Sequence, residues 1–307
     1  MEIGIVGLGR RGGNIARRLA RSTVRVVGFD VESGTRLDLQ EERVIEAAES
    51  VRAMVARLSA PRVVWLMLPA GTATELTIAD VWPELARGDV VVDGGNAHYK
   101  DSQRRAAALA SAGIQFVDCG ISGDVRGLEN GYTLMYGAKP EAMAAVLPYM
   151  KILACGENHG HVHCGAPGAG HFVTMIHKGI ESGMMQACAE GFALLQNKRD
   201  LGLDLVAIAQ TWRHGSTVGS SLLDLTAELL DENAALVDVA PAVGGSGEGR
   251  WTIQEAVEQG VPAPVLSAAL MSRFASQGRG EYAAKLVALM HKASGVHAVQ
   301  SAGGVTP

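Results

Sequence analysis

In the first half of the chain, short apolar runs alternate with longer stretches in which apolar and polar residues mix. The runs are apolar throughout, a pattern that predicts strands covered on both faces. The expected strands are Glu2–Val6, Arg25–Phe29, Arg62–Met67, Asp89–Val92, Gln115–Asp118 and Thr133–Tyr136. The expected helices between them are Asn14–Ala20, Arg43–Ala56, Ala73–Leu85 and Ser102–Ala110. This alternation predicts an α/β domain with a mostly parallel, doubly wound sheet.

The pattern changes near Cys164, after which almost the whole chain is expected to be helical. His171–Asn197 contains no proline and only isolated glycines, which predicts one long helix. Breaks are expected at Asp200–Leu203, Pro241–Gly249 and Gly260–Pro264, with Trp212–Leu223 helical. The sequence therefore predicts two domains, an α/β domain over residues 1–164 and an all-α domain with a long central helix over residues 165–307.

Composition and charge narrow the class of protein. The 307 residues carry a formal net charge of −5 and no basic block, which argues against a nucleic-acid surface. The longest apolar run, Val63–Pro69, is too short to span a bilayer, and because an expected strand already starts at Glu2 we expect no secretion signal. Cysteines 119, 155, 164 and 188 lack Cys-x-x-Cys spacing and are expected to be free thiols. We therefore expect a cytoplasmic protein that does not bind membranes or nucleic acid.

A glycine-rich turn links the first expected strand to a helix. Its sequence is Gly7-Leu8-Gly9-Arg10-Arg11-Gly12, the fingerprint of a Rossmann dinucleotide site when it stands between a strand and a helix. Asp30 ends the second strand, where a carboxylate binds the ribose 2′-hydroxyl and repels a 2′-phosphate. NAD is therefore the expected cofactor, although Arg10 and Arg11 could also contact phosphates.

Motifs spread from Gly7 to about His297 resemble those of the 6-phosphogluconate dehydrogenases of the short bacterial type, within the β-hydroxyacid dehydrogenase superfamily. They are Leu68-Pro69-Ala70-Gly71, Asp93-Gly94-Gly95-Asn96, Ile121-Ser122-Gly123, Gly127-Leu128-Glu129-Asn130-Gly131, Gly168-Ala169-Gly170-His171-Phe172, His177, Gly179-Ile180-Glu181, Gly247-Glu248-Gly249-Arg250-Trp251-Thr252 and Gly295-Val296-His297. The resemblance implies cofactor contacts from Leu68, Pro69, Ala70 and Asn96, and substrate contacts from Ser122 and Gly123. It also implies a homodimer in which the C-terminal segment completes the partner's site.

The catalytic residues that the resemblance implies are only partly retained. The family's glutamate matches Glu181 and its substrate-binding histidine matches His177, but Thr174 stands in the place of its lysine base. Lys178 stands where the family has asparagine, on the same helix face as Thr174 and Glu181. A shift of four residues moves the amine by about 6 Å along a helix, which Lys178 could span to act as the base. The alternative is an ordinary ion pair between Lys178 and an acid such as Glu181.

The substrate residues that the resemblance implies also differ. Asp124 replaces a glycine beside the place of the substrate carboxylate, where two like charges about 4 Å apart repel by about 4 kcal/mol at an effective dielectric near 20. Ser182 replaces a tyrosine beside the phosphate, and His291 replaces the arginine that reaches the phosphate from the partner. Gly219 replaces a further arginine. The arginines at 250 and 273 and His297 keep their places. We therefore expect 6-phosphogluconate not to be the substrate.

The main hypothesis is an NAD-dependent oxidoreductase that oxidises a secondary alcohol of a sugar or sugar-derived substrate. The first alternative is a redox-neutral dehydratase that uses tightly bound NAD for transient oxidation, elimination and re-reduction of a sugar or nucleoside. The remaining alternatives are an authentic decarboxylating 6-phosphogluconate dehydrogenase, an imine reductase and a catalytically inactive NAD sensor. His159, His161, His163 and Cys164 lie close in sequence, but no second ligand group with suitable spacing is evident, so no metal site is expected. Ser122 lacks the Gly-x-Ser-x-Gly turn of a hydrolase nucleophile.

Overall fold

The computed structural model describes residues 1–123, 127–156, 158–245 and 247–294. The chain separates into two compact units, Met1–His177 and Lys178–Pro307. Among the described residues, no helix combines the length and the apolar composition that a bilayer crossing requires.

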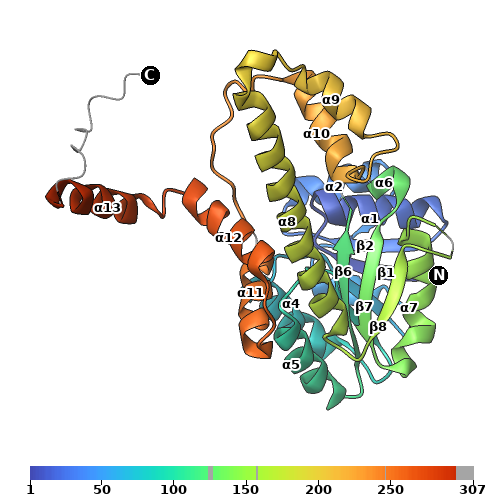
Figure 1. Cartoon of the computed structure of the whole chain (residues 1–307). Coiled ribbons are helices and arrows are strands. Elements are labelled where there is room, and N and C mark those ends of the chain that lie inside the picture. Colours follow the sequence, from blue (N-terminus) through green and yellow to red (C-terminus); the bar gives the residue numbers. More distant parts are fainter. Residues whose placement is uncertain (124–126, 157, 246, 295–307) are drawn as a thin grey trace. The chain divides into compact units, whose positions relative to one another are not determined.

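The first unit is built on one eight-stranded sheet with the order β3-β2-β1-β4-β5-β6-β7-β8 (Figure 1). All neighbouring strands are parallel except β6 and β7. The predicted mostly parallel, doubly wound sheet is therefore confirmed. The strands are β1 (Glu2–Val6), β2 (Arg25–Phe29), β3 (Glu46–Ala47), β4 (Val63–Leu66), β5 (Val90–Asp93), β6 (Gln115–Ser122), β7 (Thr133–Ala138) and β8 (His161–Gly165).

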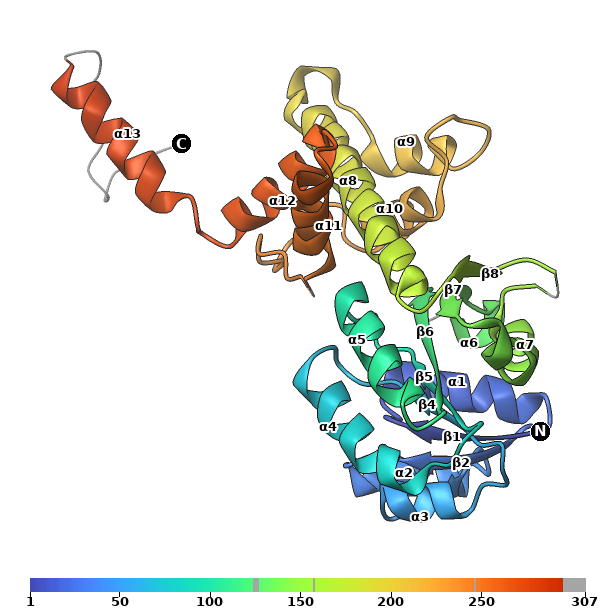
Figure 2. The ribbon, with the colours of Figure 1, turned by 90° about the horizontal axis from the view of Figure 1, so that it is seen from below.

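Helices cover both faces of this sheet. One face packs against α1 (Arg10–Arg21) and α7 (Pro140–Leu153), with Leu39 of α2 (Ser33–Glu41) in the same core. The other face packs against α3 (Val51–Ala56), α4 (Thr72–Val81) and α5 (Tyr99–Ala110). In Figure 2, α1 and α3 lie on opposite sides of β1 and β2. The unit also contains the short helices η1 (Trp82–Glu84) and α6 (Gly127–Asn130).

The alternation of side chains along β1 explains why an apolar run forms this central strand. Ile3 and Ile5 are fully buried in the core with α1, whereas Val6 is buried in the core with α3. Successive side chains of a strand point to opposite faces, so a strand between two helical layers needs apolar residues at every position.

The helix expected over Arg43–Ala56 is wrong in its first half. Residues 46 and 47 form β3, which pairs with β2 at the edge of the sheet. The helix itself begins at Val51, because the Ser50 hydroxyl accepts the Ala53 N–H at 3.0 Å and caps it. Helices α2 and α7 were not anticipated, and β6 runs four residues beyond its expected end.

The predicted long helix is confirmed as α8 (Ala169–Asn197), which begins in the first unit and continues into the second. It is followed by η2 (Arg199–Leu201), α9 (Leu205–Trp212), α10 (Ser221–Glu232), α11 (Glu248–Gln259), α12 (Pro264–Ser276) and α13 (Glu281–Ala293). A helix over Trp212–Leu223 is wrong. The chain breaks at 213–220, where Gly215 has a φ of +76° and the Ser220 hydroxyl accepts the Leu223 N–H to start α10.

The second unit has its own apolar core where α8, α9 and α10 meet. Phe192 of α8, Leu205 and Ala209 of α9, and Leu223, Ala227 and Leu230 of α10 are all buried there. The predicted all-α character of the C-terminal part of the chain is thus confirmed.

Candidate active site

The glycines of the turn between β1 and α1 serve different geometric needs. Gly7 has a φ of +89°, and a side chain there would place its Cβ 2.5 Å from the Met67 carbonyl oxygen. A Cβ at Gly12 would lie 1.9 Å from the Gly7 carbonyl oxygen, so the helix can approach the strand only without one. Gly9, in contrast, faces open space. The turn therefore has the tight bend and the open cradle that a pyrophosphate needs.

The start of α1 offers unpaired donors beside this cradle. Gly9 is its N-cap residue and the first turn contains no acid and no side-chain cap among the described residues. The N–H groups of the first turn are therefore available to an anion, and the helix dipole favours one there. Arg10 and Arg11 are exposed on this turn. These features fit the phosphates of a dinucleotide.

Asp30 lies directly after β2 and is bound to the turn. Its Oδ2 accepts the Leu8 N–H at 2.6 Å and its Oδ1 accepts the Glu32 N–H at 2.9 Å. Each carboxylate oxygen has a second lone pair, so the ribose hydroxyls can still be bound. The side chain expected to recognise the ribose is thus held rigidly beside the glycine turn.

The loops after β4 and β5 pack closely against each other. A Cβ at Gly95 would lie 2.4 Å from the Leu68 carbonyl oxygen, which explains the glycine there. Pro69 and Ala70 are exposed, and the Pro69 carbonyl accepts the Thr74 hydroxyl at 2.9 Å. This contact ties the loop to α4. Of the predicted cofactor residues in this loop, Pro69 and Ala70 therefore form an exposed rim after β4, and Leu68 is partly buried against the apolar core.

Beneath this rim lies a buried ion pair that sequence reasoning missed. Asp93 Oδ2 accepts from Arg105 Nη1 at 2.7 Å, and both side chains are at most 1% exposed. The second oxygen of Asp93 accepts the Gly95 N–H at 3.0 Å. The acid of the Asp-Gly-Gly-Asn motif is therefore a structural residue that shapes the loop. The only sequence signal for this pairing is an arginine in the helix that follows the motif.

Asn96 joins the cofactor loop to the predicted substrate residues. It has a φ of +52°, and its side chain both accepts the Ile121 N–H at 2.9 Å and donates to the Ile121 carbonyl at 3.3 Å. Ser122 ends β6 directly after this contact, and Gly123 follows with a φ of +141°. Asn96 thus fixes the end of β6, from which Ser122 projects.

A second residue that sequence reasoning missed anchors α8. Asp118 of β6 is buried and accepts the N–H groups of Gly168 at 2.5 Å and His171 at 2.7 Å. Burial raises the pKa of this carboxyl group, and the attraction of His171 opposes that rise. The His171 Nδ1 atom lies 2.8 Å from the Ser102 hydroxyl of α5. The first turn of the long helix is thereby fixed to β6 and α5.

Thr174 occupies the position of the family's lysine, and its surroundings are tightly packed. The side chain is 1% exposed, and its hydroxyl donates to the Gly170 carbonyl at 2.8 Å. A Cβ at Gly120 of β6 would lie only 1.6 Å from this hydroxyl. Thr174, which the sequence places among the candidate catalytic residues, thus donates its hydroxyl proton within the helix and packs against β6.

Lys178 and Glu181 form the ion pair that was the alternative to a catalytic lysine. Lys178 Nζ lies 2.7 Å from Glu181 Oε2, with about a quarter of each side chain exposed (23% and 28%). His177 is half-buried on the preceding position of α8. The amine is accessible to a ligand, and in this arrangement it donates to the carboxylate.

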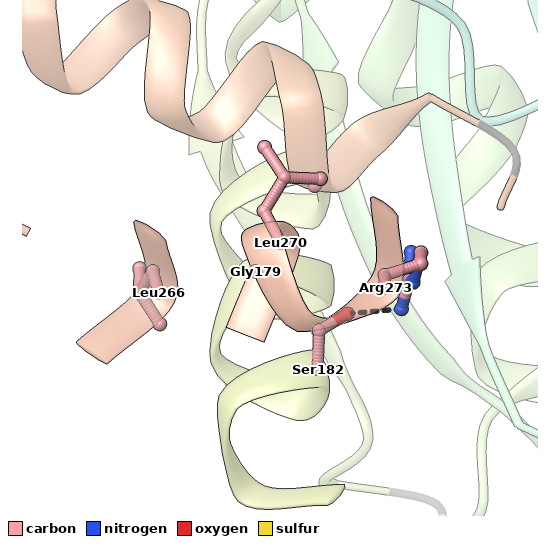
Figure 3. Close-up of a pocket in the computed structure, with 6 residues that line it drawn as sticks. Gly179, Ser182, Leu266, Leu270 and Arg273 are labelled. Carbon is pink, nitrogen blue, oxygen red and sulfur yellow. Dashed lines mark hydrogen bonds between the residues drawn. The ribbon is translucent and has the colours of Figure 1, made fainter. Parts of the chain in front are cut away.

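A small pocket in the second unit holds two predicted substrate residues. Figure 3 shows Ser182 and Arg273 pointing toward each other, with Leu266 and Leu270 on the pocket wall. The Ser182 hydroxyl accepts from Arg273 Nη2 at 3.1 Å and donates to the Lys178 carbonyl at 2.9 Å. Ser182 therefore holds the guanidinium of Arg273 at the pocket. The Arg250 guanidinium lies over the Phe274 ring at 5.4 Å.

The predicted site residues fall into two groups, one in each unit. The first unit holds Gly7, Leu8, Gly9, Arg10, Arg11, Gly12, Asp30, Leu68, Pro69, Ala70, Asn96, Ser122, Gly123, Thr174 and His177; the second holds Lys178, Glu181, Ser182, Arg250, Arg273 and His291. His291 is exposed on α13, and Gly219 lies in the break between α9 and α10. Asp124 and His297 lie outside the described residues.

The histidines near the end of the first unit flank one aromatic side chain. The rings of His161 and His163 stack on Tyr136, with centroids at 6.3 and 5.7 Å, which places both on one face of β8 as their alternation predicts. His163 Nε2 contacts the Ala138 carbonyl at 3.0 Å. In the described part of the chain, no group of three or more His, Cys, Asp or Glu side chains is arranged to hold a metal ion.

Together, the parallel sheet, the glycine turn before α1 and the bound Asp30 define a dinucleotide-binding oxidoreductase with a helical second domain. Family models agree along nearly the whole chain. Residues 2–165 match the NAD binding domain of 6-phosphogluconate dehydrogenase, and residues 170–302 match the 6-phosphogluconate dehydrogenase C-terminal domain.

The chain belongs to the 6-phosphogluconate dehydrogenase family. It is 40% identical over 300 residues to the NAD(+)-dependent, decarboxylating 6-phosphogluconate dehydrogenase of Haloferax volcanii, covering 97% of this chain and 98% of that one. It is 35% identical to a putative 6-phosphogluconate dehydrogenase of Bacillus subtilis (strain 168), covering 98% and 99% of the two chains. The fold is that of Plasmodium falciparum 6-phosphogluconate dehydrogenase, at a TM-score of 0.83 and 24% identity over 100% of this chain and 67% of that one.

Proposed function

We propose that this protein is an NAD-dependent dehydrogenase that oxidises a secondary alcohol of a sugar or sugar-derived substrate other than 6-phosphogluconate. The observation that carries this proposal is the packing of Thr174 at the position of the family's lysine. Its hydroxyl donates to the Gly170 carbonyl and packs tightly against Gly120 of β6. The chain keeps the family's cofactor turn while it lacks the family's base at the usual position.

Asp30 supports NAD as the cofactor. Its carboxylate is held at the end of β2 by the N–H groups of Leu8 and Glu32. A ribose 2′-hydroxyl can donate to a carboxylate in this place, and a 2′-phosphate would be repelled by it. The relative from Haloferax volcanii is named as NAD(+)-dependent, whereas the enzyme from Plasmodium falciparum is described with NADP+.

Lys178 is the proposed base. It is four residues beyond Thr174 on α8, and an amine is the side-chain type that can take a proton from an alcohol near neutral pH when it is deprotonated. NAD, when bound, supplies the hydride acceptor. Lys178 must first break its ion pair with Glu181 before its amine can contact the substrate alcohol and accept a proton from it. Glu181 then lies next to the base as a proton donor, and His177 and Ser122 bind the substrate's oxygens.

The second unit supports a substrate other than 6-phosphogluconate. Arg273 is present, but Ser182 contributes a short hydroxyl where the family has tyrosine, and that hydroxyl already binds the guanidinium. His291 stands where the family has an arginine, and an imidazole lacks the forked guanidinium that binds phosphate oxygens in pairs. Both changes weaken the binding of a phosphate, whereas Arg250 and Arg273 still favour an oxygen-rich ligand.

The test is NADH formation with a panel of polyols, sugars, sugar acids and 6-phosphogluconate. We expect stoichiometric NADH from one of the neutral alcohols and no CO₂ from 6-phosphogluconate. Lys178→Met should lower kcat by about 100-fold or more, the usual size of a general-base contribution. Thr174→Ala should retain activity, and Lys198→Met, which removes an exposed lysine paired with Asp200, is the matched control.

Rapid release of CO₂ from 6-phosphogluconate would contradict the proposal, as would full activity of Lys178→Met on the true substrate. Turnover without release of NADH would instead indicate the redox-neutral dehydratase.

We also propose a homodimer, as the family resemblance implies. Helix α13 supports it with several exposed apolar side chains, among them Tyr282 at 80% and Met290 at 60% exposure. A short helix with so many exposed apolar side chains gains stability when another surface covers it.

A further inference from the structure

We propose that Arg105 is a positioning residue for the cofactor, because its buried guanidinium joins the two loops on the nicotinamide side of the dinucleotide site. This inference rests on the dinucleotide site proposed above. It predicts that loss of this joint weakens the binding of the nicotinamide half and leaves the binding of the adenosine half unchanged.

One side of the guanidinium holds the loop after β5. Arg105 Nη1 donates to Asp93 Oδ2 at 2.7 Å, and the other carboxylate oxygen of Asp93 accepts the Gly95 N–H at 3.0 Å. The Arg105 side chain is 1% exposed and the Asp93 side chain is fully buried. Asp93 therefore connects the guanidinium directly to the main chain of the loop that carries Asn96.

The other side of the same guanidinium holds the first turn of α4. The Nε and Nη2 atoms of Arg105 donate to Glu75 Oε1 at 2.9 and 2.7 Å. The Glu75 N–H donates to the Gly71 carbonyl at 3.1 Å, at the point where the loop after β4 enters the helix. Glu75 therefore connects the guanidinium to the loop after β4.

The two loops are in contact, so the guanidinium fixes both of them as one surface. A Cβ at Gly95 would lie 2.4 Å from the Leu68 carbonyl oxygen. Helices α4 and α5, which carry Glu75 and Arg105, lie side by side on one face of the sheet (Figure 1 and Figure 2). Arginine can make this joint because its donors point in several fixed directions, whereas the ammonium of a lysine is a single point.

The order of the strands determines which half of a dinucleotide meets these loops. A dinucleotide crosses a doubly wound sheet where the strand order reverses, with one mononucleotide on each side. Here the reversal lies between β1 and β4. Asp30 follows β2, on the side of the adenosine ribose, so the loops after β4 and β5 lie on the side of the nicotinamide. Loops that are fixed before binding lose less freedom when the ligand arrives, which strengthens binding.

The experiment compares the dissociation constants of NADH and ADP, measured by calorimetry without any substrate. ADP carries the adenosine and the pyrophosphate but no nicotinamide. Arg105→Lys keeps a positive charge beside Asp93 and breaks the joint, so we expect NADH binding to weaken by about tenfold and ADP binding by less than about twofold. Arg104→Lys is the matched control, because Arg104 is an exposed neighbour that binds Glu75 and Asp101, and it should leave both constants unchanged.

A second variant acts on the other end of the joint. Glu75→Ala releases α4 and leaves the pair of Asp93 and Arg105 in place, so it should weaken NADH binding to a similar extent. The double variant Arg105→Lys/Glu75→Ala should bind NADH about as weakly as either single variant, because all three lack the same joint.

Three results would overturn the role of Arg105: unchanged NADH affinity in folded Arg105→Lys or Glu75→Ala, equal losses for NADH and ADP, or additive losses in the double variant. Thermal unfolding shows whether each variant is folded, and Glu75→Ala tests the joint without altering the buried pair. A wild type that binds neither nucleotide would instead contradict the proposed cofactor site itself.

Discussion

Thr174 of α8 packs against Gly120 of β6. This contact gives a structural reason for the threonine at the position of the family's lysine, which the sequence alone does not provide. The resemblance to the family implies that its lysine is replaced by Thr174, and the sequence offers an amine four residues later, at Lys178. It does not reveal that the Thr174 hydroxyl donates back to Gly170 and occupies the space that a side chain at 120 would need. Such a contact depends on the distance between two elements, which no local pattern encodes. The cofactor residues are different, because their spacing in one strand–turn–helix segment is itself the signal.

The contact predicts a large cost for the smallest possible change at Gly120. Gly120→Ala would place a methyl group 1.6 Å from the Thr174 hydroxyl, so β6 and α8 must move apart. We expect a loss of about 2 kcal/mol or more in the free energy of unfolding, measured by urea denaturation. Gly191→Ala is the control, because that position of α8 faces open space and should gain up to about 1 kcal/mol from helix propensity. Equal effects of the two substitutions would contradict the packing described for Thr174.

Among the elements, those with long apolar runs were predictable and those defined by pairing or capping were not. β1 and β2 have the bounds that the sequence predicts, since each is an apolar run buried on both faces. The two-residue β3 exists only because it pairs with β2 at the sheet edge, and the break at 213–220 depends on a glycine and on capping by Ser220. Edge pairing and helix caps involve one or two contacts each, so the sequence pattern predicts them poorly.

Helix α5 is fixed to the sheet by a buried ion pair, which gives a prediction at this scale. Arg105→Met would leave the Asp93 carboxylate buried without its guanidinium partner. We expect the free energy of unfolding to fall by about 3–5 kcal/mol. Arg104→Met, at the preceding position of the helix, removes an arginine that is 58% exposed and should cost less than about 1 kcal/mol. Urea denaturation of both variants tests the difference, and similar costs would show that the buried pair does not hold α5.

Glu75 of α4 binds both arginines of α5 and makes this contact sensitive to pH. Hydrogen bonds from Arg104, and then from Arg105, lower the pKa of the Glu75 carboxyl, against the opposing effect of partial burial. A lowered pKa in the folded state contributes stability above the ordinary value, and that stability is lost as the pH falls through the lowered value. The stability difference between the wild type and Glu75→Gln should therefore be largest near neutral pH and shrink below about pH 4. Urea denaturation across this range measures it; a difference that does not change with pH would contradict the pairing.

At the scale of the whole molecule, the sequence led to the family and to the two kinds of structure that the chain contains. The glycine turn, Asp30 and the dispersed motifs predicted a nicotinamide-binding α/β domain and a helical domain, and the family models match those two parts in turn. The substrate could not be predicted in the same way. Its recognition depends on which arginines, serines and histidines come together across distant segments, and several of these residues differ from the family's.

The assembly is testable without knowing the substrate. We expect light scattering on the purified protein to give about twice the 32.1 kDa of one chain, because α13 exposes apolar side chains that a second copy would cover. Replacement of Leu286 and Met290 with serine should shift the mass toward that of the monomer, and Val257→Ser on α11 is a control for the loss of an exposed apolar side chain. A wild type that is monomeric at all concentrations would contradict the proposal.

Asp30 has two roles, in cofactor choice and in the support of the glycine turn, and together they constrain how such a protein can evolve. The same carboxylate that selects against a 2′-phosphate also accepts the Leu8 N–H of the glycine turn. Substitutions that change cofactor choice at this position therefore also alter a hydrogen bond of the turn that binds either cofactor. Asparagine is the accessible intermediate, since it is one nucleotide change from aspartate in the genetic code and preserves an acceptor. The structure therefore leaves a narrow mutational route between the two nicotinamide pools of a cell.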